Sequence, residues 1–386
     1  MRIRGTHPAV LATAVATFGS FLGIGIVDPI LPSIARELGA SHFMVMFLFT
    51  SYLLIMGLAN LVAGALATRI GNKQTLILGL AIVAVFSGAC ALVSTVESLT
   101  VLRGFWGLGN ALFTTTALSI IVGVAGKNTE RAIGFYEASL GFGIACGPLL
   151  GGVLGANSWR LPFVGASVIM ILAIAFVGMT VREPATERKQ GIRDVVVTYR
   201  HPGVRTAAIV GMLYTFGYFT LFAYTPLILG IGTVKIGLVF FLWGLLLVVG
   251  STTVSPRLNP RYGITKVTSF SLVLFGALLA LMGASTNSMA LSVLVVLGGL
   301  LCGMLNANLT TLAMGVSDHG RSVGSGAFNS LRFIGGAFAP ITAGLLGQTY
   351  GETVPFVFAT VVVLTGAFVL LTRFDTFAVL TSEPVH

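Results

Sequence analysis

The sequence predicts an all-α polytopic membrane protein, with twelve transmembrane helices in two parallel six-helix repeats around a central cavity. Three observations lead to this fold class: the composition, the grouping of apolar residues into blocks, and short segments that recur in the second half. Of the 386 residues, 55% are hydrophobic and only 9% are charged. Soluble domains carry about a quarter charged residues, so this composition excludes an ordinary cytosolic fold, a disordered chain and a secreted module.

The apolar residues fall in blocks of about 20, and each block is long enough to cross a hydrocarbon core of about 30 Å as a helix. The expected spans are 9–31, 43–67, 74–93, 98–122, 132–155, 161–181, 206–230, 236–255, 264–285, 289–314, 323–347 and 354–373. One long polar stretch separates the sixth span from the seventh. We therefore expect an N-terminal six-helix bundle over 1–181, a cytoplasmic linker over 182–205 and a C-terminal six-helix bundle over 206–386.

The formal net charge of +10 indicates the orientation of the chain in the membrane rather than a nucleic-acid partner. Of the 22 Lys and Arg residues, Arg36, Arg160 and Lys235 fall in the loops of one side, and Arg103 and Arg332 fall inside spans. All the others lie on the opposite side. Because an excess of Lys and Arg marks cytoplasmic loops, the expected location is the cell (inner or plasma) membrane, with both termini in the cytoplasm.

Short segments of the first half return in the second half, in the same order and at nearly one offset. The recurring pairs are Arg69-Ile70-Gly71 with Arg261-Tyr262-Gly263, Asn110-Ala111 with Asn306-Ala307, Arg131–Gly134 with Arg321–Gly324, and Pro162-Phe163-Val164 with Pro355-Phe356-Val357. The offset is close to half the chain length. Since each half has an even number of spans, both halves have the same orientation, which predicts parallel repeats that can rock around a central cavity.

Four motifs resemble those of one family. The loop after the second span, Gly64–Lys73, reads GALATRIGNK and resembles the GxLADRxGRK loop of the major facilitator superfamily. Arg103–Gly109 is similar to the RxxxGxG motif of that family, and Gly143–Gly152 to its GxxxGPxxGG antiporter motif. Asp28–Pro32 resembles the proline pair that ends the first helix of drug exporters. The resemblance covers the whole chain and implies a twelve-helix drug:proton antiporter.

The resemblance implies a gating role for the loop between the second and third spans and for the matching arginine of the second half. The gating residues that it implies are Gly64, Arg69, Gly71, Lys73 and Arg261. The loop departs from the family pattern at Thr68, where an acid is expected, and at Asn72, where a second basic residue is expected. A gating ion pair is therefore in doubt, and Arg69 and Lys73 can equally serve as positive anchors of the topology.

The glycines of the fifth span predict a hinge. Gly143, Gly147, Gly151 and Gly152 recur at four- and five-residue spacing, which lets neighbouring helices approach closely. Pro148 removes a backbone donor and can kink the span. The alternative is that these glycines only pack two helices together.

Four ionisable residues lie inside the expected spans, where a charge costs a few kcal/mol and needs a partner or a function. Asp28 is expected toward the outer leaflet, partly wetted and within reach of Arg103. Glu137 is expected near the cytoplasmic end of the fifth span and Arg332 near mid-depth of the eleventh. Burial disfavours the charged form of a carboxyl group and a guanidinium favours it, so a proton and a cationic substrate can compete for such an acid. We expect these four residues to couple transport to protons; the structural alternatives are a helix cap, a backbone contact or an interhelical lock.

Aromatic and amide side chains of the spans are candidates to line an apolar, promiscuous cavity. The candidates are Phe21, Tyr52, Asn110, Phe113, Tyr136, Tyr218, Phe222, Asn306 and Asn329. Any one phenylalanine of a membrane protein more often faces lipid. An amide inside a span is the stronger candidate, because it needs an interior partner.

The function that these features predict is proton-coupled secondary active transport, exporting lipophilic or cationic small molecules by alternating access. Two alternatives share the fold: a proton-coupled uptake symporter of a small metabolite, and an exporter of lipids or siderophores. An enzyme is not expected, because all five histidines lie outside the spans and no nucleophile or metal-ligand pattern occurs. We expect no metal, no cofactor besides the proton gradient, and a monomer whose partners are protons, membrane lipid and a small-molecule substrate.

Overall fold

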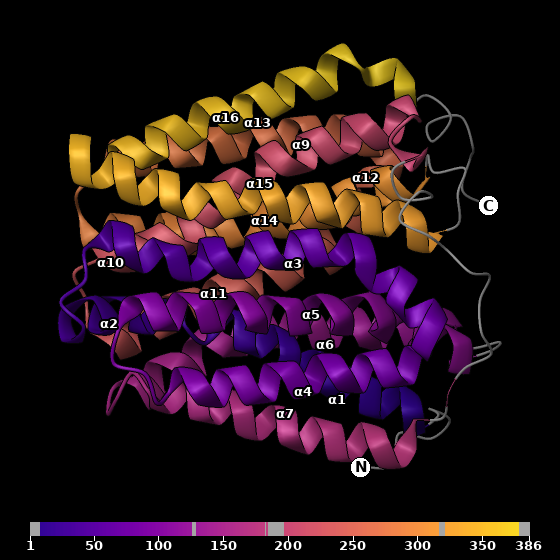
Figure 1. Cartoon of the computed structure of the whole chain (residues 1–386). Coiled ribbons are helices and arrows are strands. Elements are labelled where there is room, and N and C mark those ends of the chain that lie inside the picture. Colours follow the sequence, from indigo (N-terminus) through magenta and orange to yellow (C-terminus); the bar gives the residue numbers. More distant parts are fainter. Residues whose placement is uncertain (1–7, 126–128, 182, 184–196, 316–320, 378–386) are drawn as a thin grey trace.

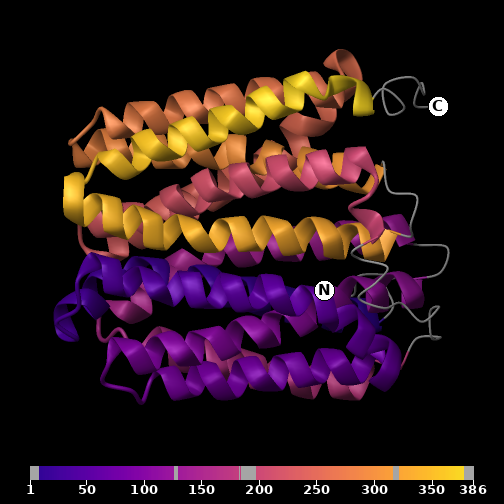
Figure 2. The ribbon, with the colours of Figure 1, turned by 45° about the horizontal axis from the view of Figure 1, so that its top comes forward.

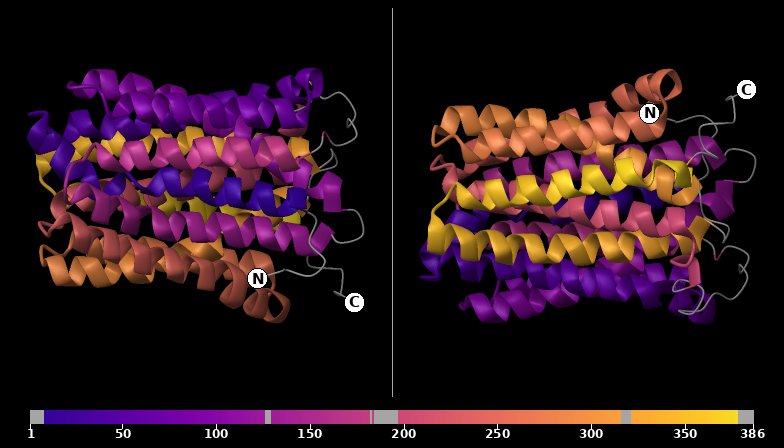
Figure 3. Two further views of the ribbon diagram at one scale, coloured as in Figure 1. Left: turned by 90° about the horizontal axis from the view of Figure 1, so that it is seen from below. Right: turned by 90° about the horizontal axis from the view of Figure 1, so that it is seen from above.

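The computed structural model describes residues 8–125, 129–181, 183, 197–315 and 321–377. Within these ranges the chain is almost entirely helical and contains no strand. The helices run side by side along one common direction in every view (Figure 1, Figure 2 and Figure 3). The expected all-α fold class is confirmed.

The first six spans form what we call the N-terminal half. Its first span consists of α1 (Pro8–Gly25), the 3₁₀ turn η1 (Asp28–Ile30) and α2 (Leu31–Glu37). The other five are α3 (His42–Ile70), α4 (Asn72–Cys90), α5 (Val96–Ala125), α6 (Thr129–Gly155) and α7 (Leu161–Thr180).

The last six spans form the C-terminal half. Its first span consists of α9 (Pro202–Phe219), the π turn η3 (Thr220–Tyr224) and α10 (Thr225–Ile228). The next consists of α11 (Thr233–Val249), the π turn η4 (Gly250–Val254) and α12 (Ser255–Tyr262). The remaining spans are α13 (Ile264–Gly283), α14 (Ser288–Gly315), α15 (Arg321–Tyr350) and α16 (Val354–Thr372), and a 3₁₀ turn η5 (Phe374–Phe377) follows.

Ten of the helical stretches, taken over the described residues, are long and apolar enough to cross a membrane. The other two, α5 with 30 residues and α6 with 27, exceed the roughly 20 residues that a span needs. The twelve-helix layout is confirmed, and most expected spans agree with a helix to within a few residues.

Two spans run further than expected. The first, expected over 9–31, leaves the α-helix after α1 and continues through η1 and α2 to Glu37. Pro29 and Pro32 lack backbone N–H groups, so the regular hydrogen-bond ladder is interrupted there. The eighth span, expected to end near residue 255, continues through η4 to Tyr262. Its proline-rich sequence is typical of a loop, but Pro256 lies in the first turn of α12, where a missing N–H costs nothing.

The two halves repeat in backbone geometry as well as in sequence. Gly71 and Gly263 occupy matching loops, with φ of 98° and 85°. Each donates its N–H to the carbonyl four residues earlier, over 2.9 Å in both cases, and each precedes the next helix. The first span of each half is also interrupted at a matching place, by η1 in one half and by η3 in the other. The predicted repeat is confirmed.

The halves pack against each other along two pairs of helices, α3 with α15 and α6 with α11. Figure 1 shows α3 beside the orange helices of the C-terminal half, and Figure 2 shows the indigo-to-magenta and pink-to-yellow helices gathered on opposite sides. The start of α1 and the end of α16 lie at the same end of the bundle (Figure 1). This arrangement follows from an even number of spans in each half.

Candidate functional site

Arg103 of α5 is completely buried and lies between aromatic rings. Its Cζ atom is 4.6 Å from the ring centroid of Tyr52, 4.6 Å from that of Trp106 and 5.9 Å from that of Phe49. Nε, Nη1 and Nη2 have no hydrogen-bond partner among the described residues. The guanidinium is therefore held by cation–π contacts, while its donors remain available.

Asp28 lies at the start of η1, and it too is completely buried. Both of its carboxylate oxygens lack a hydrogen-bond partner among the described residues. Its charge and that of Arg103 interact electrostatically, without a hydrogen bond between them. The expectation that Asp28 is partly wetted is wrong, because the break at η1 turns the residue into the bundle between α6 and α11.

A chain of polar side chains crosses the N-terminal half beside Arg103. Ser20 of α1 donates to Asn110 Oδ1 of α5 over 2.7 Å, and Asn110 Nδ2 donates to the hydroxyl oxygen of Tyr52 on α3. All three side chains are buried. Asn110 thus has the interior partners that an amide in a span needs, and it fixes the Tyr52 ring that stacks on Arg103.

The C-terminal half holds a corresponding cluster around Asn306 of α14. Arg332 of α15 donates from Nη2 to Asn306 Oδ1 over 2.7 Å, and the Tyr214 hydroxyl of α9 lies 3.0 Å from the same oxygen. The Tyr214 hydroxyl also lies 3.0 Å from the carbonyl oxygen of Cys302. Asn110 and Asn306, which occupy matching positions of the repeat, each bind a tyrosine and lie near an arginine.

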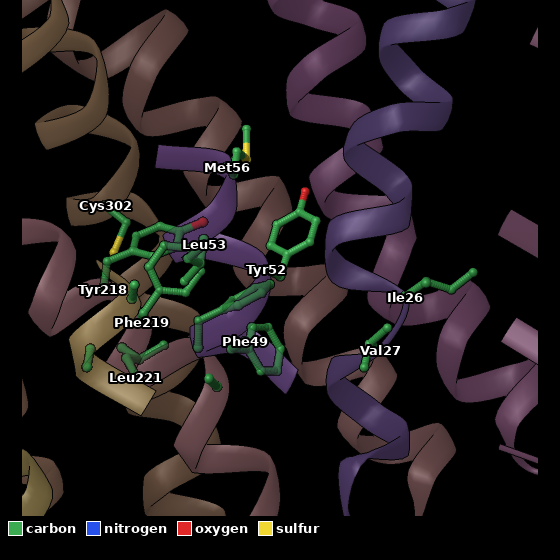
Figure 4. Close-up of a cluster of buried hydrophobic side chains, with 14 of the residues drawn as sticks. Ile26, Val27, Phe49, Tyr52, Leu53, Met56, Tyr218, Phe219, Leu221 and Cys302 are labelled. Atoms are coloured by element: carbon green, nitrogen blue, oxygen red, sulfur yellow. The ribbon is translucent and has the colours of Figure 1, made fainter. Parts of the chain in front are cut away.

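Tyr218 and Phe222 lie in a buried aromatic cluster of the C-terminal half. Their rings stack with centroids 5.7 Å apart, and Trp243 of α11 lies 5.5 Å from Tyr218 and 4.9 Å from Phe222. Figure 4 shows Tyr218 and Cys302 on one side and Leu53 and Tyr52 of α3 on the other. These residues bring the two halves into apolar contact at the centre of the molecule.

The other cavity candidates are more dispersed. The backbone of Phe113 approaches Gly79 of α4, and Phe21 of α1 lies against Gly143 of α6, so both belong to helix contacts inside the N-terminal half. Tyr136 of α6 is buried and Asn329 of α15 is half-buried. Glu137 falls in α6, but its side chain lies outside the described residues.

The glycine motif of α6 forms a close seam with two helices. A Cβ atom on Gly143 or Gly147 would lie 2.5 or 2.6 Å from a backbone carbonyl oxygen of α1, and one on Gly151 would lie 2.1 Å from that of Ile26, the residue after α1. A Cβ on Gly152 would lie 2.9 Å from the Thr233 carbonyl oxygen of α11, and Gly237 of α11 approaches the carbonyl oxygen of Pro148 in the same way. The motif therefore places α6 in backbone contact with its own half and with the other half at once.

The loop between α3 and α4 has an acidic partner that sequence reasoning missed. Glu183, just after α7, accepts hydrogen bonds from the backbone N–H groups of Asn72 over 2.6 Å and Lys73 over 2.9 Å. Its carboxylate lies against Gly71, where a Cβ would be 3.0 Å away. Thr68 occupies the position of the family acid, and Glu183 supplies a negative charge to this loop from another part of the chain. A glutamate directly after a span is the only signal in the sequence.

The remaining gating candidates lie at the helix ends. Lys73 Nζ donates to the Gly178 carbonyl oxygen of α7 over 3.1 Å. Arg69 is exposed, Arg261 lies 5.4 Å from the ring centroid of Tyr262, and Gly64 lies in ordinary contact with Thr115. The structure therefore joins Gly71 and Lys73 to α7 and Glu183, and it leaves Arg69 and Arg261 at the surface.

A residue near the end of the expected linker also contacts a helix of the C-terminal half. The Tyr199 hydroxyl donates to the carbonyl oxygen of Ala327 on α15. Burial raises the pKa of Tyr199 to about 12, so the hydroxyl keeps its proton at physiological pH. Glu183 thus binds the first residues after α7 to the N-terminal half, and Tyr199 binds the residues before α9 to the C-terminal half.

The chain has twelve spans in two parallel repeats, with charged groups, amides and aromatic rings at their centre. This arrangement defines a class of protein, the polytopic membrane transporters. Comparison with known proteins identifies the family. A family model described as Major Facilitator Superfamily matches residues 13–340. The chain belongs to the Major Facilitator Superfamily.

Two curated relatives are similar over nearly their whole length. The chain is 44% identical over 365 residues to the multidrug efflux protein YfmO of Bacillus subtilis, covering 94% of this chain and 92% of the relative. It is 25% identical over 358 residues to multidrug resistance protein 1 of the same organism, covering 90% and 92%.

Two solved structures share the fold. A bacterial homologue of the human lysosomal transporter Spinster, in an inward-facing and unoccupied conformation, has a TM-score of 0.80 at 16% identity and covers 98% of each chain. The human organic anion transporter MFSD10 has a TM-score of 0.74 at 16% identity, covering 94% of this chain and 99% of that one. At 16% sequence identity, the similarity to these structures shows a shared fold only.

Proposed function

We propose that this protein is a proton-coupled exporter of lipophilic or cationic small molecules that works by alternating access. Similarity to a multidrug efflux protein over 94% of the chain supports the export of such compounds. The observation that carries proton coupling is Asp28, a completely buried carboxyl group without a hydrogen-bond partner among the described residues. The protein acts as a monomer without enzymatic activity, and the proton gradient takes the place of a cofactor.

Asp28 is the group that exchanges the proton in this proposal. Burial disfavours its charged form, and the positive charge of Arg103 favours it. Because these effects oppose each other, a small change in their separation or in solvent access moves the carboxyl group between its protonated and charged forms. A cationic compound that approaches Asp28 favours the charged form and expels the proton, which couples export to proton entry.

Two further ionisable residues, Arg332 and Glu137, contribute to proton coupling in this proposal. Arg332 adjoins the central aromatic cluster, since it donates to Asn306 Oδ1 and the Tyr214 hydroxyl beside Tyr218 lies 3.0 Å from the same oxygen. Glu137 is the second acidic residue expected well inside a span. If Asp28 does not exchange the proton, we expect Glu137 to do so. Tyr52, Asn110, Tyr218, Phe222 and Asn306 line the path of the compound.

The moving units in this proposal are the bundles 1–181 and 206–386, joined by the linker 182–205. Their orientation places both termini and the linker in the cytoplasm, where the basic loops lie. At the opposite end of the bundle, Gly344 of α15 packs against Phe43 of α3, and Gly152 packs against Thr233. These contacts support a conformation closed on the extracellular side. Rocking along the seam of α6 with α1 and α11 would open this side, while the loop containing Arg69 and Lys73 closes the other.

Transport by the purified protein in proteoliposomes tests the proposal. With an inward proton gradient, addition of a lipophilic cation is expected to cause proton movement that a pH-sensitive dye detects, and collapse of the gradient is expected to stop accumulation of the compound. Proton flux caused by a polar nutrient but by no lipophilic cation or neutral compound would contradict the proposal and favour an uptake symporter.

A further inference from the structure

The charges inside the spans are divided unequally between the two halves. The N-terminal half contains Asp28, Arg103 and Glu137. None of the helices α9 to α16 contains an acidic residue, because the four acids of the second half fall outside their bounds: Asp318, Glu352, Asp375 and Glu383. Arg332 is eleven residues beyond the start of α15, so it is a deep positive charge in a half whose spans carry no negative one.

Only some of the N–H donors of the Arg332 guanidinium group have a hydrogen-bond partner among the described residues. Of its five N–H donors, Nη2 donates to the neutral Asn306 amide oxygen over 2.7 Å. Nε is buried and has no hydrogen-bond partner among the described residues. The rings of Phe328 and Phe333 lie 5.8 and 5.6 Å from Cζ and supply further apolar surroundings. A cation inside a span usually has an anion for a partner, and among the described residues this one has an amide.

Asn306 orients this guanidinium and is itself held in place. Its Oδ1 atom lies 3.0 Å from the Tyr214 hydroxyl on α9, so three helices meet at one oxygen atom. Arg332 and Asn306 are both half-buried, whereas Asp28 and Arg103 are completely buried. Of the two arginines inside the spans, the one in the C-terminal half is therefore the more accessible.

The aromatic cluster around Tyr218 adjoins the Arg332–Asn306 pair through Tyr214, whose hydroxyl lies 3.0 Å from Asn306 Oδ1. Tyr218 is one helical turn beyond Tyr214, with ring centroids 6.1 Å apart, and it faces α3 across the centre (Figure 4). The cation of Arg332 therefore adjoins an aromatic surface that faces α3 of the other half.

We propose that Arg332, oriented by Asn306, binds a carboxylate group of the transported compound, and that the substrates therefore include zwitterionic amphiphiles. This inference rests on the proposed export function and specifies its substrate class. A guanidinium fork matches a carboxylate with two parallel hydrogen bonds, which supplies the counter-charge that the C-terminal half lacks. The aromatic rings hold the apolar body of the compound, and its cationic group lies toward Asp28.

A pair of dyes tests this assignment: a rhodamine with a free carboxyl group, which is a zwitterion, and its methyl ester, which is a cation. Binding to the purified protein in detergent is measured by fluorescence anisotropy, and transport is measured in proteoliposomes. Arg332→Gln is expected to weaken binding of the free acid at least about tenfold and to leave the ester within about twofold. Arg332→Lys keeps a charge and is expected to recover part of the loss, and Arg257→Gln on exposed α12 serves as the control.

The outcomes separate this inference from the proposed function. Equal binding of the free acid by wild type and Arg332→Gln overturns the inference, as does an equal loss of both dyes in a variant that elutes as folded protein. If the free acid binds through Arg332 but neither dye moves in liposomes, the export function is wrong and the carboxylate site remains.

Discussion

At the scale of single residues, Asp28 and Arg103 are two opposite charges with zero exposure and no hydrogen bond to a described residue. Each has lost its hydration, and cation–π contacts with Tyr52 and Trp106 compensate only the arginine. Attraction between the two opposite charges opposes the cost of burying each of them. Transport activity is expected to depend steeply on both.

We predict that Asp28→Asn uncouples transport from the pH gradient and weakens binding of cations more than binding of neutral compounds. Arg103→Ala is expected to be worse, because it leaves the Asp28 carboxyl without a compensating charge and so keeps it protonated. Drug-driven proton flux in liposomes measures both effects. If Asp28→Asn keeps wild-type flux and Glu137→Gln loses it, proton exchange belongs to Glu137 and our assignment is wrong.

A second residue-scale prediction concerns Glu183. Its carboxylate binds two N–H groups at the start of α4, where the partial positive charge of the helix favours an anion. Glu183→Ala is expected to lower the free energy of unfolding by roughly 1 kcal/mol, the usual value of such a cap, and to slow transport. Thermal unfolding in detergent and flux in liposomes are the measurements, with exposed Glu37→Ala as the control. Identical behaviour of the two variants would show that the contact is not needed.

At the scale of helices, α6 is the element that the two halves share. Its glycines contact α1 on one side and α11 on the other, so any side chain there separates backbones that now touch. Two helices can slide along such a seam only if no side chain projects between their backbones. The structure shows that this seam serves packing, and the proposed rocking motion would slide along the same seam.

We predict that Gly147→Leu abolishes transport and leaves expression nearly normal, because the new side chain would wedge α6 away from Leu22 and Gly25 of α1. Gly178→Leu is the matched control, since a Cβ at this helical glycine of α7 has no atom within 4 Å. Flux is measured together with the yield of monodisperse protein. Loss of folded protein in Gly147→Leu alone would assign the motif to packing, and full activity would contradict both roles.

At the scale of the whole molecule, the chain between the halves is tied to each of them. Glu183 binds the loop of the N-terminal half, and Tyr199 binds α15 of the C-terminal half. Both contacts lie at the end of the bundle where α1 begins and α16 ends. That end is the one to which the basic loops assign the cytoplasm.

We predict that a cysteine at Gln190 is inaccessible from outside intact cells, whereas a cysteine at Asn157, in the loop after α6, reacts there with a membrane-impermeant maleimide. The native cysteines Cys90, Cys146 and Cys302 are replaced by serine beforehand. Permeabilised cells are the control, in which both sites are expected to react. Labelling of Gln190→Cys from outside would reverse the orientation and the proposed direction of export.

The sequence by itself determined the class of fold, because hydrophobic length and the distribution of basic residues depend only on the energetics of lipid and water. The repeat also followed from sequence: Gly71 and Gly263 are matching glycines, and both adopt a positive φ that favours glycine. The candidates Asp28, Arg103, Asn306 and Arg332 could be selected because a polar group within a span is costly.

The tertiary structure decided which of these candidates meet. Burial of Asp28 follows from the helix break at η1, which a hydropathy pattern does not resolve. The contact of Glu183 with Asn72 and Lys73 joins residues more than a hundred positions apart, and the cluster of Tyr214, Asn306 and Arg332 joins three helices. Sequence periodicity fixes which face of a helix is apolar, but the partner of a polar side chain depends on the rotation and depth of its neighbours, and these are set by packing of the whole bundle.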